Sequence, residues 1–420
     1  MNILKNEYIS TTIGKLSTML GTILTTILLN RYLGPSLRGE YALVINQMVL
    51  VTSVLNLGIP HIYHYFYRKS SKYFIIFKNL IFTQFIILIL LNIFIQFFFK
   101  INNSTRIILI LIPIVILAQQ INIISLVSDL NKRNVNNIYT TFFNIAFWIF
   151  IFICSKQNII LPYLAYAFKE IFFCIISFKL IDFKLKEYRF ELKEWKSIII
   201  VAFVPMLTMI LNTMNYRVDT IILGYTVDTF ELGLYSAALS ITEIAWIFPD
   251  IFKEIMFSKS AKNDSIDVIC RSIKFTLIIN FIMILGIIIF GKIIIFILMG
   301  KEYLSAYNVI ILLFFGIPSM SFFKIINPVY LANGERSFAF KTLLIAVVVN
   351  VGFNFILIPY LGISGAAIGS IFSYTICGII FLFSFVKRYN VKLSDLFIIN
   401  KEDIEVISEF FVNKGVKEKI

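Results

Sequence analysis

Charged side chains inside long apolar stretches are the first residues in this sequence that could do chemistry. Arg217 closes a polar run that begins at Asn212, and Asp219 follows it two residues later. A charge in a membrane-spanning segment costs about 2.5 kcal/mol or more, so such a residue usually faces a protein interior or a water-filled cavity. The guanidinium group keeps its charge and offers a planar fork of donors, which suits a pyrophosphate. Arg217 is therefore the strongest candidate for binding an anion.

Arg217 has a second interpretation, in which it pairs with a carboxylate and stabilises the packing of helices. The two acids available to it are Asp219 and Glu243. Residues two apart point in nearly opposite directions on a helix, so a pair with Asp219 needs an unwound or terminal geometry. Glu243 is itself a candidate ion or proton site, and it is equally well interpreted as a buried acid neutralised by an arginine.

The other candidates are charges with two open interpretations each. Lys324 lies toward one end of its apolar stretch, where it either meets a pyrophosphate entering from that side or extends to the lipid headgroups. Lys169 and Glu170 are adjacent, so we expect at most one of them to face a cavity squarely; the alternative is an ion pair with another helix. Arg31 and Arg38 flank a Gly-Pro turn, where they either meet a departing ligand or only border the turn.

The composition identifies the solvent around these residues. Hydrophobic residues make up 59% of the 420 and charged residues 15%, with a mean hydropathy of +0.87. Soluble proteins have about 45–50% apolar and about 25% charged residues, so the lipid bilayer must surround this chain. The four cysteines have no CxxC spacing and the two histidines stand alone, which predicts no disulfide framework, no metal site and no cofactor. The net charge of +14 rests largely on lysine, and we expect no nucleic-acid partner.

Hydropathy predicts an all-α integral membrane protein with twelve transmembrane helices. The spans are expected near residues 11–30, 40–62, 73–99, 107–128, 138–155, 159–180, 197–223, 233–252, 275–299, 303–331, 340–358 and 364–386. Of the 38 Lys and Arg, 28 fall on one side of this topology and 6 on the other. The positive-inside rule then places both termini in the cytoplasm, and we expect no cleaved signal peptide.

Two internal echoes predict a duplicated unit of six spans. In one of them, DLNKRN (129–134) follows the fourth span and LANGERS (331–337) follows the tenth, an offset of 203 residues. The segment Gly39-Glu40-Tyr41-Ala42 after the first span resembles Gly233-Leu234-Tyr235-Ser236 after the seventh, an offset of 194 residues. We therefore expect one six-helix bundle in residues 1–190, a second in 191–386, and a cytoplasmic tail in 387–420 that is either an amphipathic surface helix or disordered. Parallel repeats facing a central cavity are a transporter architecture.

Four segments in this order carry a family resemblance. They read RYLGPSLRGEYALV (31–44), LNLGIPHIYHYF (55–66), RVDTIILG with ELGLYSAA (217–224 and 231–238), and NFILIPYLGISGAAIGS (354–370). Together they resemble the polysaccharide-transporter branch of the multidrug/oligosaccharidyl-lipid/polysaccharide exporter superfamily, and most of all its O-antigen and capsule repeat-unit flippases.

The resemblance implies a fold, a cargo and a compartment. The fold is two six-helix bundles around a central cavity with alternating access. The cargo is an oligosaccharide on an undecaprenyl pyrophosphate carrier, moved across the bacterial inner membrane from the cytoplasmic to the outer leaflet. Implied partners are membrane lipids, a polysaccharide polymerase and a chain-length regulator.

Neutral polar residues and glycines inside the spans are further candidates. The amides are Asn46, Gln47, Gln84, Gln119, Gln120 and Asn144, which either contact sugars or hydrogen-bond between helices. Gly362, Gly365 and Gly369 include a small-xxx-small spacing that lets two helices approach closely.

Two alternative functions remain open. A multidrug or cation antiporter of the same superfamily would want an acidic cavity, whereas the intramembrane charges here include four Lys or Arg. A membrane enzyme such as a repeat-unit polymerase or glycosyltransferase would need a sizeable outer loop or acidic loop clusters, and the predicted loops are short. The sequence also lacks GxxxxGK[ST], so we expect no ATP hydrolysis. Because the predicted loops leave no room for a soluble catalytic domain, we expect the protein not to be an enzyme.

Overall fold

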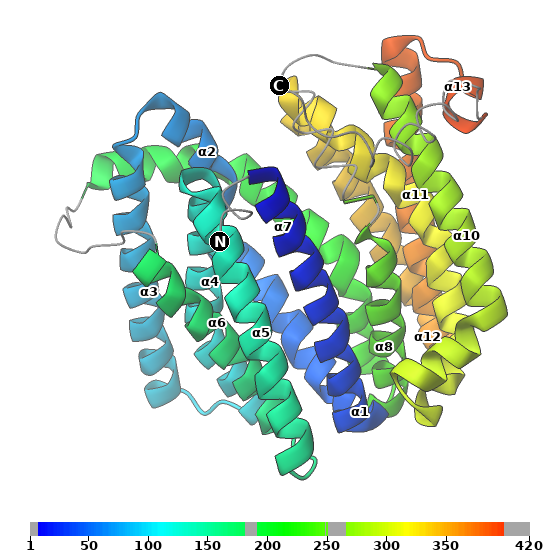
Figure 1. The fold of residues 1–420 in the computed structure, drawn as a ribbon, viewed down its shortest axis with the longest axis horizontal. Helices are drawn as coiled ribbons and strands as arrows, with labels where there is room; N and C mark the ends of the chain where they lie inside the picture. Colours follow the sequence, from blue (N-terminus) through cyan, green and yellow to red (C-terminus); the bar gives the residue numbers. More distant parts are fainter. Residues whose placement is uncertain (1–6, 181–190, 248, 251–265, 399–420) are drawn as a thin grey trace.

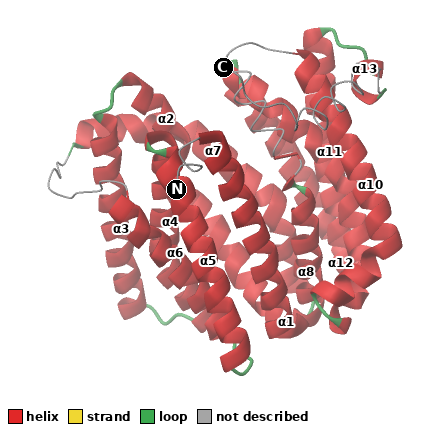
Figure 2. Ribbon diagram, viewed as in Figure 1, coloured by secondary structure: helices red, strands yellow, loops and turns green. Residues whose placement is uncertain are grey.

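The protein is a bundle of long helices in a computed structural model that describes residues 7–180, 191–247, 249–250 and 266–398. Figure 2 shows helices joined by short loops throughout this part of the chain. In order they are α1 (Glu7–Leu55), α2 (Ile59–Lys69), α3 (Tyr73–Phe98), α4 (Asn103–Ser128), α5 (Leu130–Cys154), α6 (Ile160–Leu180), α7 (Leu192–Thr226), α8 (Thr229–Ala245), α10 (Ile266–Leu298), η3 (Lys301–Ala306), α11 (Tyr307–Ala332), α12 (Arg336–Tyr389) and α13 (Ser394–Phe397).

Nine helical stretches among the described residues are long and apolar enough to cross a membrane, which confirms the predicted class of all-α membrane protein. Two helices are far longer than the roughly 20 residues that a bilayer needs, since α1 has 49 and α12 has 54. Each is broken by one glycine at positive φ, Gly34 in α1 and Gly362 in α12. Counting each as two spans brings the structure closer to the predicted topology, but the number twelve stays a prediction.

The breaks in α1 and α12 turn the chain back on itself. In Figure 1, α1 begins at the upper end, reaches the lower end and returns toward α2. In α12, a Cβ on Gly365 would collide with the carbonyl oxygen of Leu357, eight residues earlier and across the break. The predicted close approach of helices at this glycine is therefore confirmed, and it occurs between the two arms of one reversed helix.

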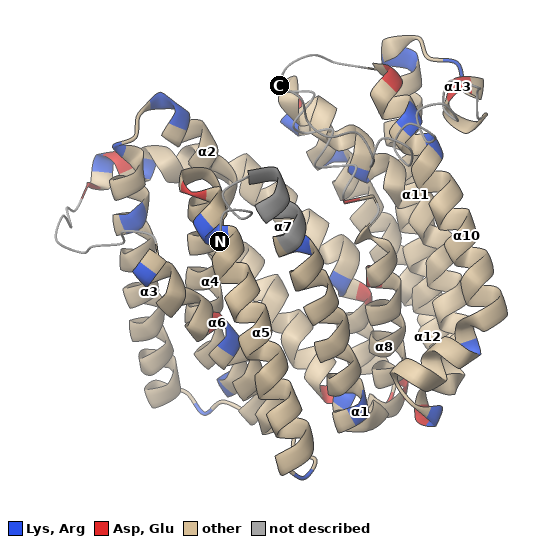
Figure 3. Cartoon of the chain, viewed as in Figure 1, with Lys and Arg blue, Asp and Glu red and all other residues tan. Residues whose placement is uncertain are grey.

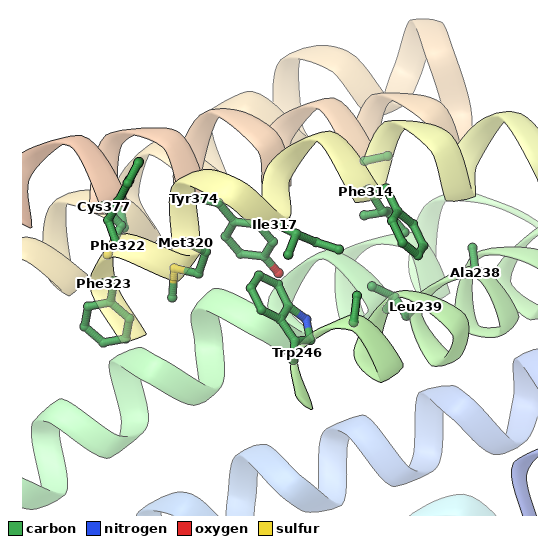
Figure 4. Close-up of a cluster of buried hydrophobic side chains, with 14 of the residues drawn as sticks. Ala238, Leu239, Trp246, Phe314, Ile317, Met320, Phe322, Phe323, Tyr374 and Cys377 are labelled. Atoms are coloured by element: carbon green, nitrogen blue, oxygen red, sulfur yellow. The ribbon is translucent and has the colours of Figure 1, made fainter. Parts of the chain in front are cut away.

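Two groups of helices lie side by side in Figure 1, and each has its own packed interior. The first interior gathers α1 to α6, with Tyr63 and Phe77 among its fully buried rings. The second gathers α8, α10, α11 and α12, and Figure 4 shows Trp246 and Tyr374 within it. The start of α7 packs on the first group through Trp195. The proposed boundary near residue 190 falls in residues 181–190, outside the described part, and stays a prediction.

The two groups meet through equivalent residues of the sequence repeat. A Cβ on Gly39 would collide with the carbonyl oxygen of Thr229, and a Cβ on Gly233 would collide with that of Pro35. The same offset of 194 residues relates Gly39 to Gly233 and Pro35 to Thr229. A reciprocal contact of this kind is what a two-fold axis between similar units produces.

Charged residues lie mainly toward the two ends of the bundle, with few near its middle (Figure 3). At the end where α12 finishes, the chain folds back so that Leu396 is fully buried and the Phe397 ring packs against Phe322. Residues 399–420 lie outside the described part, and so does most of the predicted tail.

Candidate functional site

A polar cavity of about 490 Å³ lies between α1, α4, α5 and α6. These helices, together with α2 and α3, form the first group, which is called the first half below; the second group is called the second half. Its neutral hydrogen-bonding lining consists of Thr18, Thr22, Thr25, Thr26, Gln119, Asn122, Asn137, Thr140, Thr141 and Asn144. Ligand pockets have volumes of about 300–1,000 Å³ and are mostly apolar, so this one has the usual size and an unusual chemistry.

The helix geometry of α1 explains this lining. Thr18, Thr22 and Thr25 are spaced so that they share one face of the helix. The hydroxyl of Thr22 donates to the Thr18 carbonyl at 2.8 Å, and that of Thr25 donates to the Gly21 carbonyl at 2.9 Å. The hydroxyl protons are therefore satisfied within the helix, while the oxygen lone pairs stay available at the cavity surface.

Lys169 and Glu170 both line this cavity and pair with each other at 3.0 Å. We expected at most one of these neighbours to face a cavity. The long side chain of Lys169 bends back to Glu170, so both side chains reach the cavity. The ion pair therefore forms within α6. The lysine also lies 5.5 Å from the ring centroid of Tyr166, which lines the cavity too.

Arg217 in α7 pairs with Glu243 in α8, with 2.8 Å between the guanidinium nitrogen and the carboxylate oxygen. Of the two acids open to it in the sequence, it uses the more distant one. The side chains remain 31% and 47% exposed, so the pair is accessible and is not locked inside the packed core. The helix α7 that carries Arg217 packs against α1, which lines the cavity.

Asp219 points away from Arg217 and is fully buried. Its carboxylate accepts hydrogen bonds from the Tyr235 hydroxyl, from the Ser370 hydroxyl at 2.9 Å and from the Thr220 backbone N–H at 2.7 Å. Ser373 donates to Asn215 one turn earlier in α7. This polar core ties α7 to α8 and α12 and is separate from the accessible Arg217 pair.

Lys324 in α11 pairs with Asp250, with its ammonium nitrogen 2.9 and 3.0 Å from the two carboxylate oxygens. The same nitrogen lies 4.6 Å from the ring centroid of Trp246, a cation–π distance. Lys324 is mostly enclosed while Asp250 is about half exposed. The lysine is thus held between an aromatic face and an acid, and it does not extend alone to a headgroup region.

Arg31 and Arg38 join the two halves at the end of the bundle that contains Gly34. Arg31 donates to the Ile297 and Leu298 carbonyls at the C-terminus of α10, where unsatisfied carbonyls and the helix dipole favour a cation. Arg38 is buried, donates to Asn30 at 2.8 Å and to Ser240 in α8 at 3.2 Å. Their contacts hold this end closed in the present conformation.

The predicted amides divide into two groups. Gln119 and Asn144 line the cavity. The others hydrogen-bond within the protein: Gln120 to Gln84, Gln84 to the Leu55 carbonyl, Asn46 to the Ala42 carbonyl, and Gln47 to Tyr225.

Sequence reasoning missed the threonine face and Asp250. The threonines carried a signal, because their spacing of four and three residues marks one side of α1. Asp250 carried less, since it stands at the end of an apolar stretch where acids are common. The described residues contain no group of three His, Cys, Asp or Glu that could hold a metal ion.

The helices and the cavity define a multi-pass membrane protein with a polar interior. A family of proteins described as "Polysaccharide biosynthesis protein" matches residues 4–248, so the chain belongs to that family. This confirms the resemblance seen in the sequence.

Individual proteins show similarity to this chain in sequence or fold. The capsular polysaccharide biosynthesis protein CapF of Staphylococcus aureus is 23% identical over 238 residues, which is 50% of this chain and 59% of CapF. The chain thus aligns with less than two thirds of that relative's length. The lipid II flippase MurJ in an inward closed conformation superposes with a TM-score of 0.75 at 15% identity, covering 97% of this chain and 93% of MurJ. An inward-facing MATE family multidrug resistance transporter of the MOP superfamily gives 0.70 at 13% identity, covering 89% and 94%.

Proposed function

We propose that this protein moves a lipid-linked oligosaccharide repeat unit, carried on undecaprenyl pyrophosphate, from the cytoplasmic to the outer leaflet by alternating access. Membership of the polysaccharide biosynthesis family and the transporter fold support this reading. The name of the relative CapF favours a capsular repeat unit as cargo. The protein supplies a path and performs no covalent chemistry on its cargo.

The observation that carries the proposal is the accessible ion pair between Arg217 and Glu243. A guanidinium within a membrane-spanning helix needs an anionic partner, and a half-exposed carboxylate fills that role when no cargo is bound. A pyrophosphate offers more negative charge and more acceptor oxygens than one carboxylate, and it matches the planar donors of arginine. Cargo binding then exchanges one anion for another and leaves no buried charge alone.

The energetics of the saccharide fit the same route. Each hydroxyl group taken into hydrocarbon without a hydrogen bond costs several kcal/mol. A hydrogen-bonding surface removes most of that barrier, while the polyprenyl tail stays in the lipid. An apolar drug would gain little from such a lining.

The orientation is part of the proposal, with both termini cytoplasmic and the Gly34 end of the bundle facing outward. It rests on the excess of Lys and Arg on one side of the predicted topology. Reporter fusions after residue 190 and at the C-terminus should be cytoplasmic, and a fusion at Asp228 should be outside. A C-terminal reporter that is active outside the cytoplasm contradicts it.

Deletion of the gene tests the cargo. Surface polysaccharide should be lost, and lipid-linked repeat units should accumulate on the cytoplasmic leaflet, measured by extraction and by their resistance to an external glycosidase. Normal polysaccharide together with new drug sensitivity would replace this proposal with an antiporter. Accumulated repeat units on the outer leaflet would point to a polymerase.

A further inference from the structure

We propose that the cavity in the first half is a binding site for the uncharged saccharide of the cargo, separate from the place where the diphosphate binds. This rests on the proposed function and adds a division of labour to it. Lipid-linked glycans have two chemically different head parts, hydroxyl-rich sugars and an anionic diphosphate. The cavity has the chemistry of the first and lacks that of the second.

The cavity surface offers both halves of a hydrogen bond. The threonine oxygens on α1 are acceptors, because their protons are used within the helix. The carboxamide oxygen of Gln119 accepts from Asn56 at 2.8 Å, and that of Asn122 accepts from the Arg133 guanidinium at 2.6 Å. This leaves the N–H groups of both amides as donors toward a ligand. A sugar hydroxyl both donates and accepts, so it can use such a mixed surface fully.

A diphosphate fits the same surface poorly. Its oxygens only accept hydrogen bonds, and they would meet the lone pairs of the threonine oxygens. Among the described residues, Lys169 is the one cation that lines the cavity, and it is already neutralised by Glu170 at 3.0 Å. A lipophilic cation fits poorly as well. It would need the Glu170 carboxylate, which is the one carboxylate in the described lining and is already paired with Lys169.

The position of the cavity suits a ligand that is shared with Arg217. Tyr166, next to the Lys169–Glu170 pair in α6, is part of its lining. The helix α1 lines the cavity and also packs against α7, which carries Arg217. A sugar in the cavity and a diphosphate at Arg217 can therefore belong to one molecule. Trp148 and Tyr41 add aromatic faces to the lining, on which the C–H side of a sugar ring can pack.

The test is binding of the two head parts to the purified full-length protein in lipid nanodiscs, measured by titration calorimetry. One probe is the repeat-unit saccharide released by mild acid from the host strain's lipid-linked pool, and the other is inorganic pyrophosphate. The variant Thr22→Val/Thr25→Val keeps side-chain shape and removes two acceptors. We expect saccharide affinity to fall about tenfold with pyrophosphate affinity unchanged, because each lost hydrogen bond weakens binding severalfold.

Two comparisons make the result specific. Thr226 has the same internal hydrogen bond, to the Ile222 carbonyl at 3.0 Å, and does not line the cavity, so Thr226→Val should bind both probes normally. Arg217→Ala should show the reverse pattern, with weak pyrophosphate binding and normal saccharide binding. Retained pyrophosphate binding by the double variant also shows that it is folded, and Asn144→Leu provides a second, independent change in the cavity.

Several outcomes overturn the proposal. They are a wild-type protein that does not bind the saccharide, a double variant that binds it normally, a parallel loss of pyrophosphate binding, or binding of the cationic dye ethidium that the double variant abolishes. The binding and deletion experiments can also disagree. If the purified protein shows the expected binding pattern but deletion of the gene leaves surface polysaccharide normal, the sugar site is supported and the transport function is refuted.

Discussion

The two halves of this protein place different chemistry at equivalent positions of one repeated helix-turn-helix. In the first half, Gly21, Thr25 and Tyr41 line a hollow. These side chains are small or neutral, and Gly21 lets α1 approach Thr141 of α5 closely. The result is a cavity in which hydrogen-bonding atoms face empty space.

The offset of 194 residues that relates the two halves leads from those positions to Asn215, Asp219 and Tyr235. All three are fully buried, and together with Ser370 and Ser373 they form a closed hydrogen-bonded core. Larger polar side chains have filled the space that glycine and threonine leave open. At these equivalent positions, the side chains of the first group of helices leave an open cavity, and those of the second group form a buried polar core.

The largest effect on stability should come from removing the buried carboxylate of Asp219. Asp219→Ala leaves the Tyr235 hydroxyl, the Ser370 hydroxyl and the Thr220 N–H without their acceptor in a buried site. Removing one partner from a buried charged network costs on the order of 3 kcal/mol or more. We expect little folded protein in the membrane and a lower unfolding temperature of the solubilised full chain.

Thr25→Val is the matched control for Asp219→Ala, because it changes the equivalent position of the other half. It should leave abundance and unfolding temperature near those of the wild type. Wild-type abundance of Asp219→Ala would show that the second half does not depend on its polar core, and the contrast drawn here would fail.

Substitutions of Arg217 distinguish a role in cargo binding from a role in folding stability. If it serves the cargo, Arg217→Ala should reduce surface polysaccharide at least tenfold at normal abundance, and Arg217→Lys should restore part of it because the charge is kept while the planar fork is lost. Polysaccharide output and membrane abundance are measured side by side. Arg388→Ala is a matched control, since Arg388 pairs with Glu335 at similar exposure and away from the site.

A purely structural role of Arg217 makes a different prediction. Arg217→Ala would then leave Glu243 unpaired and lower abundance, and the double variant Arg217→Ala/Glu243→Ala would restore abundance by removing both charges. Normal output from Arg217→Ala at normal abundance would remove this residue from the mechanism.

The contact between the two halves should respond to added volume at Gly39. A methyl group there overlaps the Thr229 carbonyl, so Gly39→Ala must push the halves apart, with an overpacking cost of about 1–3 kcal/mol. Spin labels on cysteines at Lys156 and Lys301, one in each half, should give a longer and broader distance distribution when the native cysteines are replaced by alanine.

The matched control for Gly39→Ala is Gly286→Ala. A Cβ on Gly286 meets no atom within 4 Å, so this substitution should not change the distance distribution. Equal distributions for all three proteins would mean that the reciprocal glycine contact does not hold the halves together.

Much of this fold follows from the sequence, because a bilayer allows few alternatives to apolar helices. The repeat at Gly39 and Gly233 was visible as a sequence echo, and the structure turns it into a reciprocal contact. The breaks at Gly34 and Gly362 also agree with the predicted spans, because Gly34 lies in the predicted Gly-Pro turn and Gly362 lies between the spans 340–358 and 364–386. The positive φ angles of these glycines were not predicted, since a glycine in an apolar stretch gives no indication of its φ angle.

The site was only partly predictable, because pairing depends on which helices are neighbours. Arg217 and Asp219 are only two residues apart, yet Arg217 pairs with Glu243 of α8 while Asp219 is bonded to Tyr235 of α8 and Ser370 of α12. A hydropathy profile gives the depth of a charged residue along its span. It does not show in which direction the side chain points around the helix axis. The cavity escaped notice for a related reason: threonine is nearly neutral on hydropathy scales, and only its spacing marks a face.

The smallest effect on stability is expected for a substitution of Thr25 in the cavity of the first group of helices. Thr25→Val removes one acceptor oxygen and retains the shape of the side chain and its packing in α1. Since the Thr25 hydroxyl is bonded to its own helix, its loss should change the free energy of unfolding by less than about 1 kcal/mol. If the oxygen accepts a hydrogen bond from a sugar, the transport rate should fall severalfold, and the defect should deepen when Thr22→Val is added. The rate is measured as the appearance of repeat units that are protected from added glycosidase in inverted vesicles over time, with Thr226→Val as control. An unchanged rate in the double variant would mean that the cavity does not contact the saccharide, and the contact with the cargo would then be left to Arg217.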